Sequence, residues 1–226
     1  MGERTGDTLQ QRIVAMILER GLEPGAPMPT EPRLMDIFDA GRNTVREAVR
    51  GLQALGIVEV RHGYGTFVGS APLEVLTPSL AFWARSRPGG GIRALRELVE
   101  VRELIETGLI GRVAEDDVGP DRLAALDDLA VALEHDPEAD RAFHARLYES
   151  AGNELVLRLI GLFWDVYREL APLLDPPDLR EIVADHRGIV DALRARDPAA
   201  AQEAMRRHFR DVKSRIARAE ARAESP

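Results

Sequence analysis

The chain has 226 residues, of which 45% are apolar, and its formal net charge is −8. This length allows one large or two modest domains, each with its own core, and the absence of cysteine excludes disulfides, thiolate metal sites and cysteine nucleophiles. No run approaches the roughly 18 apolar residues of a membrane helix, and residues 1–9 contain no apolar signal core. The sequence therefore predicts a cytoplasmic protein without a membrane partner.

The acidity is concentrated in the second part of the chain. Residues 1–70 hold nine acidic residues and eight arginines, a net charge of −1, which leaves −7 of the total −8 for residues 71–226. From Gly41 to His62, four arginines stand against two glutamates, a local charge of +2. A basic patch this modest predicts that tight binding to a polyanion requires two copies of the chain.

Two short helices are expected before residue 42. The first is predicted by apolar residues at helical spacing: Leu9, Ile13, Met16 and Ile17. Residues 21–29 are rich in glycine and proline and end it. Thr30 is expected to cap the second helix, whose first turn holds Glu31 and Pro32. The buried face of this helix is expected at Leu34, Ile37 and Phe38.

A third helix, over residues 39–55, has two opposite faces. Its apolar stripe is predicted at Val45, Ala48, Val49, Leu52 and Leu55. Its other face carries Arg42, Asn43, Arg46 and Arg50. The three arginines are spaced four residues apart, which suits a row of phosphates and base edges. Taken alone, a basic face is also typical of an ordinary solvated surface.

A β-hairpin is predicted directly after this helix. Residues 57–69, IVEVRHGYGTFVG, contain two runs rich in β-branched residues around a turn at His62, Gly63 and Tyr64. Three helices followed by a hairpin constitute a winged helix-turn-helix. We therefore expect a DNA-binding domain over residues 1–70.

The rest of the chain is predicted to be helical. Six breaks rich in glycine or proline, at residues 87–91, 117–120, 135–138, 151–153, 175–177 and 196–198, delimit seven amphipathic segments. The sequence thus predicts a mainly α protein, with an antiparallel bundle of six to seven helices over residues 71–226. Residues 71–90 are expected to form a linker helix.

Three histidines and one aspartate lie on apolar stripes of this bundle. Asp140 and His144 are four residues apart on one helix, and His186 and His208 lie on two later helices. Side chains converging from three helices are a common way to build a metal site in a bundle. Imidazoles with one carboxylate suit Zn²⁺ or Ni²⁺. Core histidines with ordinary hydrogen bonds are the other interpretation of the pattern.

Residues 9–68 resemble the DNA-binding domain of GntR-family bacterial transcription regulators, because the turn, the helix GRNTVREAVRGLQAL and the wing occur in register. The resemblance implies that DNA is contacted by Arg42, Thr44, Arg46, His62 and Gly63, and that Asn43 reads a base or a phosphate. Two positions depart from the family pattern. Gly41 stands where a hydroxyl residue is frequent in the family. The family also often has a DNA-binding arginine directly after the glutamate, whereas this chain has Pro32 there and Arg33 one residue later.

Residues 95–215 resemble the FCD ligand-binding domain of the FadR-like branch of this family. The resemblance implies that Asp140, His144, His186 and His208 bind a divalent metal ion, Zn or Ni, that helps to hold a small carboxylate effector. RELVEVRELIE (96–106) resembles the opening helix of that domain. On it, Arg102 is the candidate effector-binding residue, and a salt bridge from Arg102 to Glu106 or Glu97 is the alternative.

Together these features predict a transcription regulator, expected to be a repressor, and not an enzyme. A homodimer would place two recognition helices about 34 Å apart on a pseudo-palindromic operator in double-stranded DNA. A small organic acid would alter DNA binding by favouring one pose of the two DNA-binding domains. Two alternatives are a metal-dependent enzyme in the bundle and a bundle that only dimerises.

Overall fold

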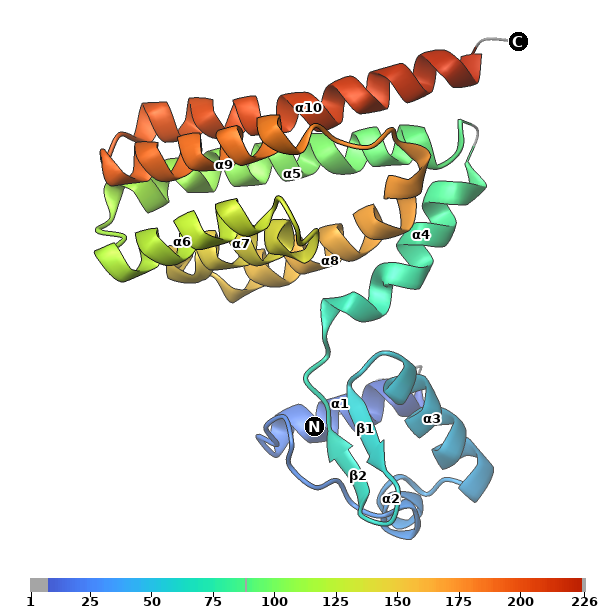
Figure 1. The fold of residues 1–226 in the computed structure, drawn as a ribbon. Helices are drawn as coiled ribbons and strands as arrows, with labels where there is room; N and C mark the ends of the chain where they lie inside the picture. Colours follow the sequence, from blue (N-terminus) through green and yellow to red (C-terminus); the bar gives the residue numbers. More distant parts are fainter. Residues whose placement is uncertain (1–7, 88, 225–226) are drawn as a thin grey trace. The chain divides into compact units, whose positions relative to one another are not determined.

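The structure is a computed structural model that describes residues 8–87 and 89–224 (Figure 1). The chain divides into two compact units, Met1–Val75 and Leu76–Pro226. The first unit contains α1 (Leu9–Glu19), α2 (Glu31–Phe38), α3 (Arg42–Ala54), β1 (Val58–Arg61) and β2 (Gly65–Val68). This is the predicted winged helix-turn-helix.

Local sequence signals account for the helix boundaries of this unit, with two corrections. Thr8 and Gln11 form a capping box at the start of α1. Thr30 occupies the N-cap position of α2, but its side chain makes no capping hydrogen bond. Leu55 was expected in the buried stripe, yet it is 48% exposed because α3 ends at Ala54 and the chain turns away there.

The hairpin is antiparallel, with Val58 paired to Val68 and Arg61 paired to Gly65. Gly63 has a φ of 80° in the turn, a conformation that glycine adopts without a steric penalty. The outer edge of β2 is also bonded: the Met28 amide donates to the Thr66 carbonyl at 2.8 Å. The wing is therefore anchored to the loop between α1 and α2.

The second unit is entirely helical in its described part. Its α-helices are α4 (Thr77–Ser86), α5 (Gly90–Glu115), α6 (Pro120–Ala132), α7 (Glu138–Tyr148), α8 (Glu154–Leu170), α9 (Leu179–Arg194) and α10 (Pro198–Glu224), with short 3-10 turns at Glu149–Ala151 and Ala171–Leu173. A further 3-10 turn, Leu73–Leu76, spans the boundary between the two units. Each predicted break separates two of these helices, so the predicted fold class is confirmed. None of the described helices is long and apolar enough to cross a membrane.

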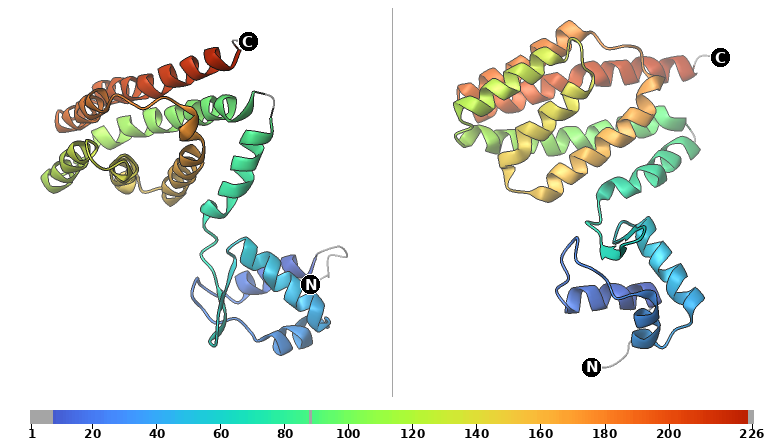
Figure 2. Two further views of the ribbon diagram at one scale, coloured as in Figure 1. Left: turned by 45° about the vertical axis from the view of Figure 1, so that its right-hand side comes forward. Right: turned by 60° about the horizontal axis from the view of Figure 1, so that its bottom comes forward.

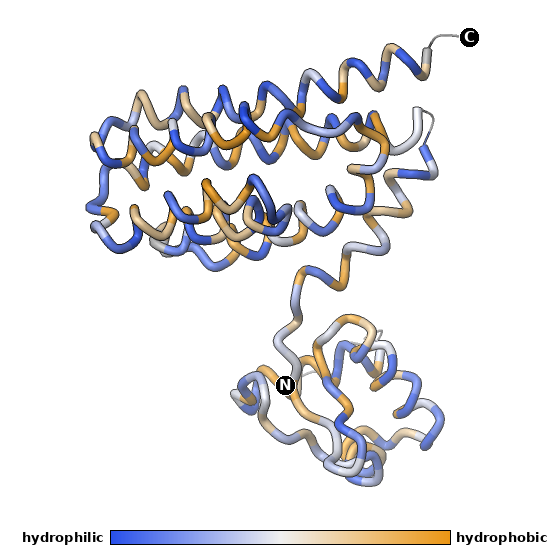
Figure 3. The backbone as a smooth tube through the Cα atoms, viewed as in Figure 1, coloured by the Kyte–Doolittle hydropathy of each residue, from blue (hydrophilic) through white to orange (hydrophobic). Residues whose placement is uncertain are grey.

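The long helices α5, α9 and α10 run side by side in the bundle (Figures 1 and 2). Apolar and polar residues alternate along each of them, as expected for helices with one buried face (Figure 3). Their core residues include Leu95, Ile110, Ile189 and Phe209, all almost fully buried. Six polar or charged residues are also buried in this unit: Arg102, Glu106, His144, Asp185, His186 and Arg215. Buried polar groups require partners, and they lead to the site described next.

Candidate functional site

The first candidate surface is the N-terminal part of α3. Gly41 is the N-cap residue of this helix, and it has no side chain to supply the hydroxyl of a serine or threonine cap. Arg42, Asn43, Thr44 and Arg46 follow in the first turns, and all four are exposed. The helix buries Val45 and Val49 on its other side. The fold thus holds the polar face of α3 toward solvent.

Most arginines of this surface have an acidic neighbour. The Arg46 Nε donates to both carboxylate oxygens of Glu31, at 2.9 and 3.3 Å. Arg50 pairs with Glu47 at 3.0 Å, while Arg33 lies 3.9 Å from Asp36. Among the described residues, Arg42 has no recorded ion pair. These pairs are solvent-exposed and contribute little to stability, so an incoming phosphate can replace them.

The turn of the wing is fully exposed. His62, Gly63 and Tyr64 form it, and Tyr64 is 84% exposed. At the base of the turn, the Arg61 guanidinium lies over the Phe67 ring, 4.3 Å from its centre. In Figure 1, this turn and the start of α3 lie at the same end of the N-terminal unit. The two parts that the sequence singled out for DNA contact are therefore presented together.

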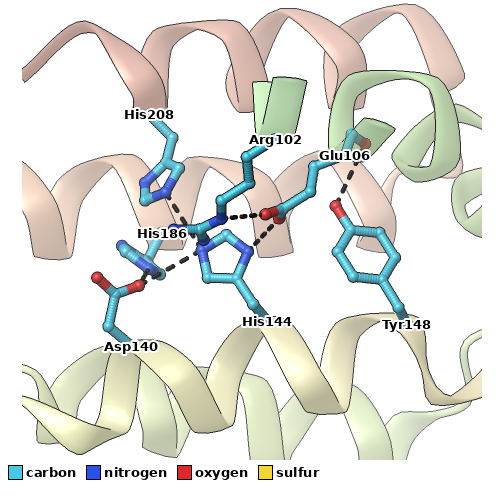
Figure 4. A network of polar contacts seen from close by, with 7 residues as sticks. All are labelled: Arg102, Glu106, Asp140, His144, Tyr148, His186 and His208. Carbon is cyan, nitrogen blue, oxygen red and sulfur yellow. Dashed lines mark hydrogen bonds and ion pairs between the residues drawn. The ribbon is translucent and has the colours of Figure 1, made fainter. Parts of the chain in front are cut away.

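The second candidate site lies inside the helical unit. Asp140 and His144 project from α7, His186 from α9 and His208 from α10, and their side chains converge (Figure 4). Their potential ligand atoms all lie within 4.8 Å of one another. The tertiary structure thus brings together four residues that are spread over 69 positions from Asp140 to His208.

The spacing of these atoms suits a divalent metal ion. The Asp140 Oδ1 lies 3.0 Å from the His186 Nε2 and 3.4 Å from the His144 Nε2, and the Nε2 atoms of His144 and His208 are 3.2 Å apart. Two ligands about 2.1 Å from one ion lie about 3.0 Å apart at a right angle and about 3.4 Å apart at a tetrahedral angle. Opposite ligands of one ion lie about 4.2 Å apart, and the four candidate atoms lie within 4.8 Å of one another, so the most distant pair needs to close by at most roughly 0.6 Å to take opposite positions.

The outer nitrogens of two imidazoles determine where their inner lone pairs point. The His186 Nδ1 donates to the Ile182 carbonyl at 2.8 Å, and the His144 Nδ1 donates to the carboxylate of Glu106. Each neutral ring therefore presents a lone pair at its Nε2. Both lone pairs face the Asp140 Oδ1, which is itself an acceptor. A cation is needed among these atoms, either a proton on the rings or one metal ion.

Charge and burial shift the titration of this cluster. Burial raises the pKa of Glu106, but the positive charge of Arg102 and the contacts with His144 outweigh it and lower the pKa to about 2. Burial lowers the pKa of His144, yet the charge of Glu106 gives a net upward shift. Burial, together with the neighbouring His186 and His144, holds the pKa of His208 well below its usual range. His208 is thus kept neutral, which is the form that binds metal.

Arg102 is buried beside the cluster and has a buried donor without a partner. Its Nε donates to the Glu106 Oε1 at 2.5 Å, and its guanidinium lies 4.2 Å from the centre of the Trp164 ring. The predicted alternative, a salt bridge to Glu106, is therefore present. Glu97 instead pairs with Arg87 and Arg93. The Arg102 Nη2 is buried without a hydrogen-bond partner, so this side chain can hold one more acceptor.

Arg102 and two of the metal-ligand candidates, Asp140 and His208, border a small cavity of about 50 Å³. Its other lining residues include Trp164, Tyr167, Asp211 and Arg215. Besides Arg102, two lining residues have buried nitrogens without partners, the Trp164 Nε1 and the His208 Nδ1. Orphaned polar groups of this kind are costly unless a ligand or water satisfies them. A molecule rich in acceptor oxygens would do so.

Glu106 is the functional candidate that reasoning from the sequence missed. It is fully buried, and it contacts both Arg102 and His144. Tyr148, four residues after His144, donates from its hydroxyl to the backbone carbonyl of Glu106 at 3.2 Å. The spacing of Glu106 four residues after Arg102 was a usable signal for the salt bridge. Its contact with His144, 38 residues further along the chain, has no local signal.

A basic recognition helix and wing, joined to a helical bundle with a buried polar cavity, define a DNA-binding regulator with a ligand-sensing domain. Two known protein families match the two parts of the chain. Residues 5–68 match the family of bacterial regulatory proteins known as gntR, and residues 97–211 match the FCD domain. The protein belongs to the GntR family of DNA-binding transcriptional regulators, in its FadR-like subfamily with a C-terminal FCD effector-binding domain.

Similar proteins carry the same kind of name. The chain is 28% identical to the HTH-type transcriptional repressor NanR of Cronobacter sakazakii, over 93% of this chain and 84% of that protein. It is 29% identical to the HTH-type transcriptional regulator LutR of Bacillus subtilis, over 87% of this chain and 94% of that protein. Among solved structures, Streptococcus agalactiae GntR matches with a TM-score of 0.66 and 30% identity, over 91% of this chain and 97% of that one. These relatives are regulators and not enzymes, as predicted.

Proposed function

We propose that this regulator is a repressor that binds a pseudo-palindromic operator in double-stranded DNA as a homodimer. Its bundle binds a divalent metal ion and a small organic acid, and the acid changes the affinity for the operator. The similarity to proteins named as NanR repressors supports repression. The observation that carries the sensing function is the Asp140 Oδ1 facing two imidazole lone pairs beside an unpaired buried arginine nitrogen.

For DNA recognition, we assign the base and phosphate contacts to the start of α3 and to the wing. The proposed contact residues are Arg33, Arg42, Asn43, Thr44, Arg46, His62 and Gly63. Arg46 is the proposed base reader, because Glu31 binds only its Nε and leaves the two terminal nitrogens free for a guanine edge. Arg33 is proposed as a phosphate contact, since its side chain is 68% exposed.

For the metal, we assign Asp140, His144, His186 and His208 as the ligands. Three imidazoles with one carboxylate suit Zn²⁺ or Ni²⁺. Two of the three histidines have the outer contact typical of metal-binding imidazoles: a carboxylate for His144 and a backbone carbonyl for His186. When bound, the ion supplies positive charge and open coordination positions for an anionic oxygen.

For the effector, the charges of the site favour a small carboxylate. The two positive charges of the ion and that of Arg102 exceed the negative charges of Glu106 and Asp140 by one, so a monoanion neutralises the site. The unpaired Arg102 Nη2 and Trp164 Nε1 are donors for its oxygens. The cavity of about 50 Å³ has room for about four water molecules. An acid of only a few carbons therefore fits without rearrangement.

For the dimer, we propose that the exposed apolar face of α5 and α8 meets its own copy. Val101 and Leu104 on α5 are 46% and 76% exposed, and Leu155 on α8 is 56% exposed. Gly108 lies one turn after Leu104, and a Cβ built on it would meet no atom within 4 Å. In an antiparallel pairing of α5 with its copy, centred next to Leu104, Val101 of one copy lies over Gly108 of the other. This match lets the two helices approach closely.

The test combines metal analysis with DNA binding. Purified full-length protein is analysed for bound metal, and its affinity for DNA upstream of its own gene is measured by fluorescence anisotropy at several salt concentrations. We expect about one equivalent of metal per chain, salt-dependent specific binding, and a change in affinity when lactate, pyruvate or acetate is added to the metal-loaded protein. If the purified protein is metal-free and its stability changes with neither added metal nor chelator, the sensing function is refuted and the bundle is only a dimerisation domain.

A further inference from the structure

One buried carboxylate lies between the two parts of the proposed sensor. The Glu106 Oε1 accepts from the Arg102 Nε at 2.5 Å, and its Oε2 accepts from the His144 Nδ1 (Figure 4). Glu106 and His144 are 0% exposed, and Arg102 is 6% exposed. Glu106 thus bonds a candidate effector-binding residue with one oxygen and a candidate metal ligand with the other.

We infer that Glu106 is a positioning residue that couples metal binding to effector binding. The inference rests on the proposed function, since it needs both a metal and a carboxylate in this site. Glu106 touches neither of them. It acts through the orientation and basicity of His144 on one side and through the placement of Arg102 on the other.

The contact with His144 determines which nitrogen of that ring faces the metal ligands. An ionised carboxylate can only accept, so the His144 Nδ1 carries the proton, and in the neutral ring that binds metal the Nε2 then carries the lone pair. The Nε2 is the atom that lies 3.4 Å from the Asp140 Oδ1 and 3.2 Å from the His208 Nε2. A negative partner on the outer nitrogen also makes the inner nitrogen a stronger ligand.

The contact with Arg102 lets a bound effector change how strongly Glu106 increases the basicity of the His144 Nε2. In the ligand-free site, the guanidinium and the imidazole share the negative charge of Glu106. A carboxylate bound at the Arg102 Nη2 partly neutralises the guanidinium and leaves more of that charge for His144. The metal then binds more tightly, and by reciprocity the metal tightens effector binding by the same factor. The coupling is therefore positive.

The rest of the environment holds this arrangement in place. The face of the Trp164 ring covers the Arg102 guanidinium at 4.2 Å, and the Tyr148 hydroxyl donates to the Glu106 carbonyl at 3.2 Å. Glu106 therefore has little freedom to change partners. A change of charge at either contact affects the other, because Glu106 and His144 are fully buried and Arg102 is 6% exposed, so screening by bulk solvent is weak.

The test measures Zn²⁺ affinity without any effector, in a double-mutant cycle of Glu106→Gln and Arg102→Gln. Competition with a chromophoric chelator gives the dissociation constant for wild type, both single variants and the double variant. Glu106→Gln should weaken Zn²⁺ binding about 10- to 100-fold, as other outer contacts of metal-bound histidines do. Arg102→Gln should tighten it, by a larger factor when Glu106 is present than when Glu106→Gln is already in place.

Two controls keep the outcomes distinct. Glu103→Gln removes a carboxylate of the same helix that pairs with Lys213 at 2.9 Å on the surface, and it should leave Zn²⁺ affinity unchanged. Wild-type protein that binds neither Zn²⁺ nor Ni²⁺ refutes the proposed function itself. The role of Glu106 alone is refuted if wild-type protein binds Zn²⁺ and Glu106→Gln binds it with the same affinity. It is also refuted if the effects of the two substitutions on Zn²⁺ affinity are additive.

A spectroscopic readout covers the case in which Arg102→Gln does not fold. The ¹⁵N chemical shifts of the His144 ring in metal-free protein report which nitrogen carries the proton. We expect the Nδ1–H form in wild type and a mixture of forms in Glu106→Gln, because an amide can also donate to the ring. An unchanged His144 tautomer in Glu106→Gln contradicts the inference.

Discussion

Replacing His208 with alanine tests the metal site with the least disturbance to other hydrogen bonds. Its Nδ1 has no partner, and its Nε2 has one recorded hydrogen-bond partner, the Nε2 of His144. Asp140, by contrast, contacts both His144 and His186. His208→Ala therefore removes one proposed ligand and leaves the outer contacts of His144 and His186 in place.

The expected size of the effect follows from linkage. At a free Zn²⁺ concentration 100 times the dissociation constant, binding stabilises the folded state by about 2.7 kcal/mol. For a unit of the size of Leu76–Pro226, about 1 kcal/mol corresponds to roughly 2–4 °C. Wild-type protein should thus melt about 5–11 °C higher with Zn²⁺ than with chelator. If His208→Ala weakens binding about 100-fold, the stabilisation falls to about 0.4 kcal/mol, and the shift to roughly 1–2 °C.

The assay is differential scanning calorimetry of each variant with buffered Zn²⁺ and with chelator. Comparing the two conditions within one variant cancels the packing cost of removing the imidazole. His135→Ala is the matched control, because the His135 side chain is 85% exposed and lies outside the cluster. Equal Zn²⁺ shifts in wild type and His208→Ala would refute the assignment of His208 as a ligand.

Three further changes test the other assignments. Arg46→Ala should reduce specific operator affinity by about 1–3 kcal/mol and relax base preference at one position; equal anisotropy-derived affinities for wild type and variant would remove Arg46 from the recognition surface. Leu104→Glu should place a charge in the proposed dimer face and give monomers in light scattering at micromolar concentration, whereas intact dimers would move the interface elsewhere. Gly69→Ala should destabilise the N-terminal unit by about 1–3 kcal/mol, because its Cβ would lie 2.0 Å from the Gly56 carbonyl oxygen; an unchanged urea midpoint for that unit would contradict the close approach.

The positions of the helices followed directly from local patterns. Apolar residues at helical spacing and six breaks rich in glycine or proline predicted all seven helices of the C-terminal unit. Both signals are local, because the helical repeat and the conformational limits of proline act within a few residues. The details at helix ends were less predictable. Thr30 makes no capping hydrogen bond, and Leu55 is exposed. The capping bond and the burial of a terminal residue both depend on the direction that the chain takes beyond the helix end.

The sequence alone also indicated which side chains face the interior of the bundle. Asp140, His144, His186 and His208 lie on apolar stripes, so periodicity was enough to direct them inward, and the family resemblance suggested that they form one site. The approach of their ligand atoms to within 4.8 Å of one another, the contact of Glu106 with His144 and the unpaired nitrogens of Arg102 and Trp164 were decided only by the tertiary structure. The physical reason is that these contacts join α5, α7, α8, α9 and α10 across long stretches of chain. Which atoms meet there depends on how the helices pack, and no pattern within one helix encodes that packing.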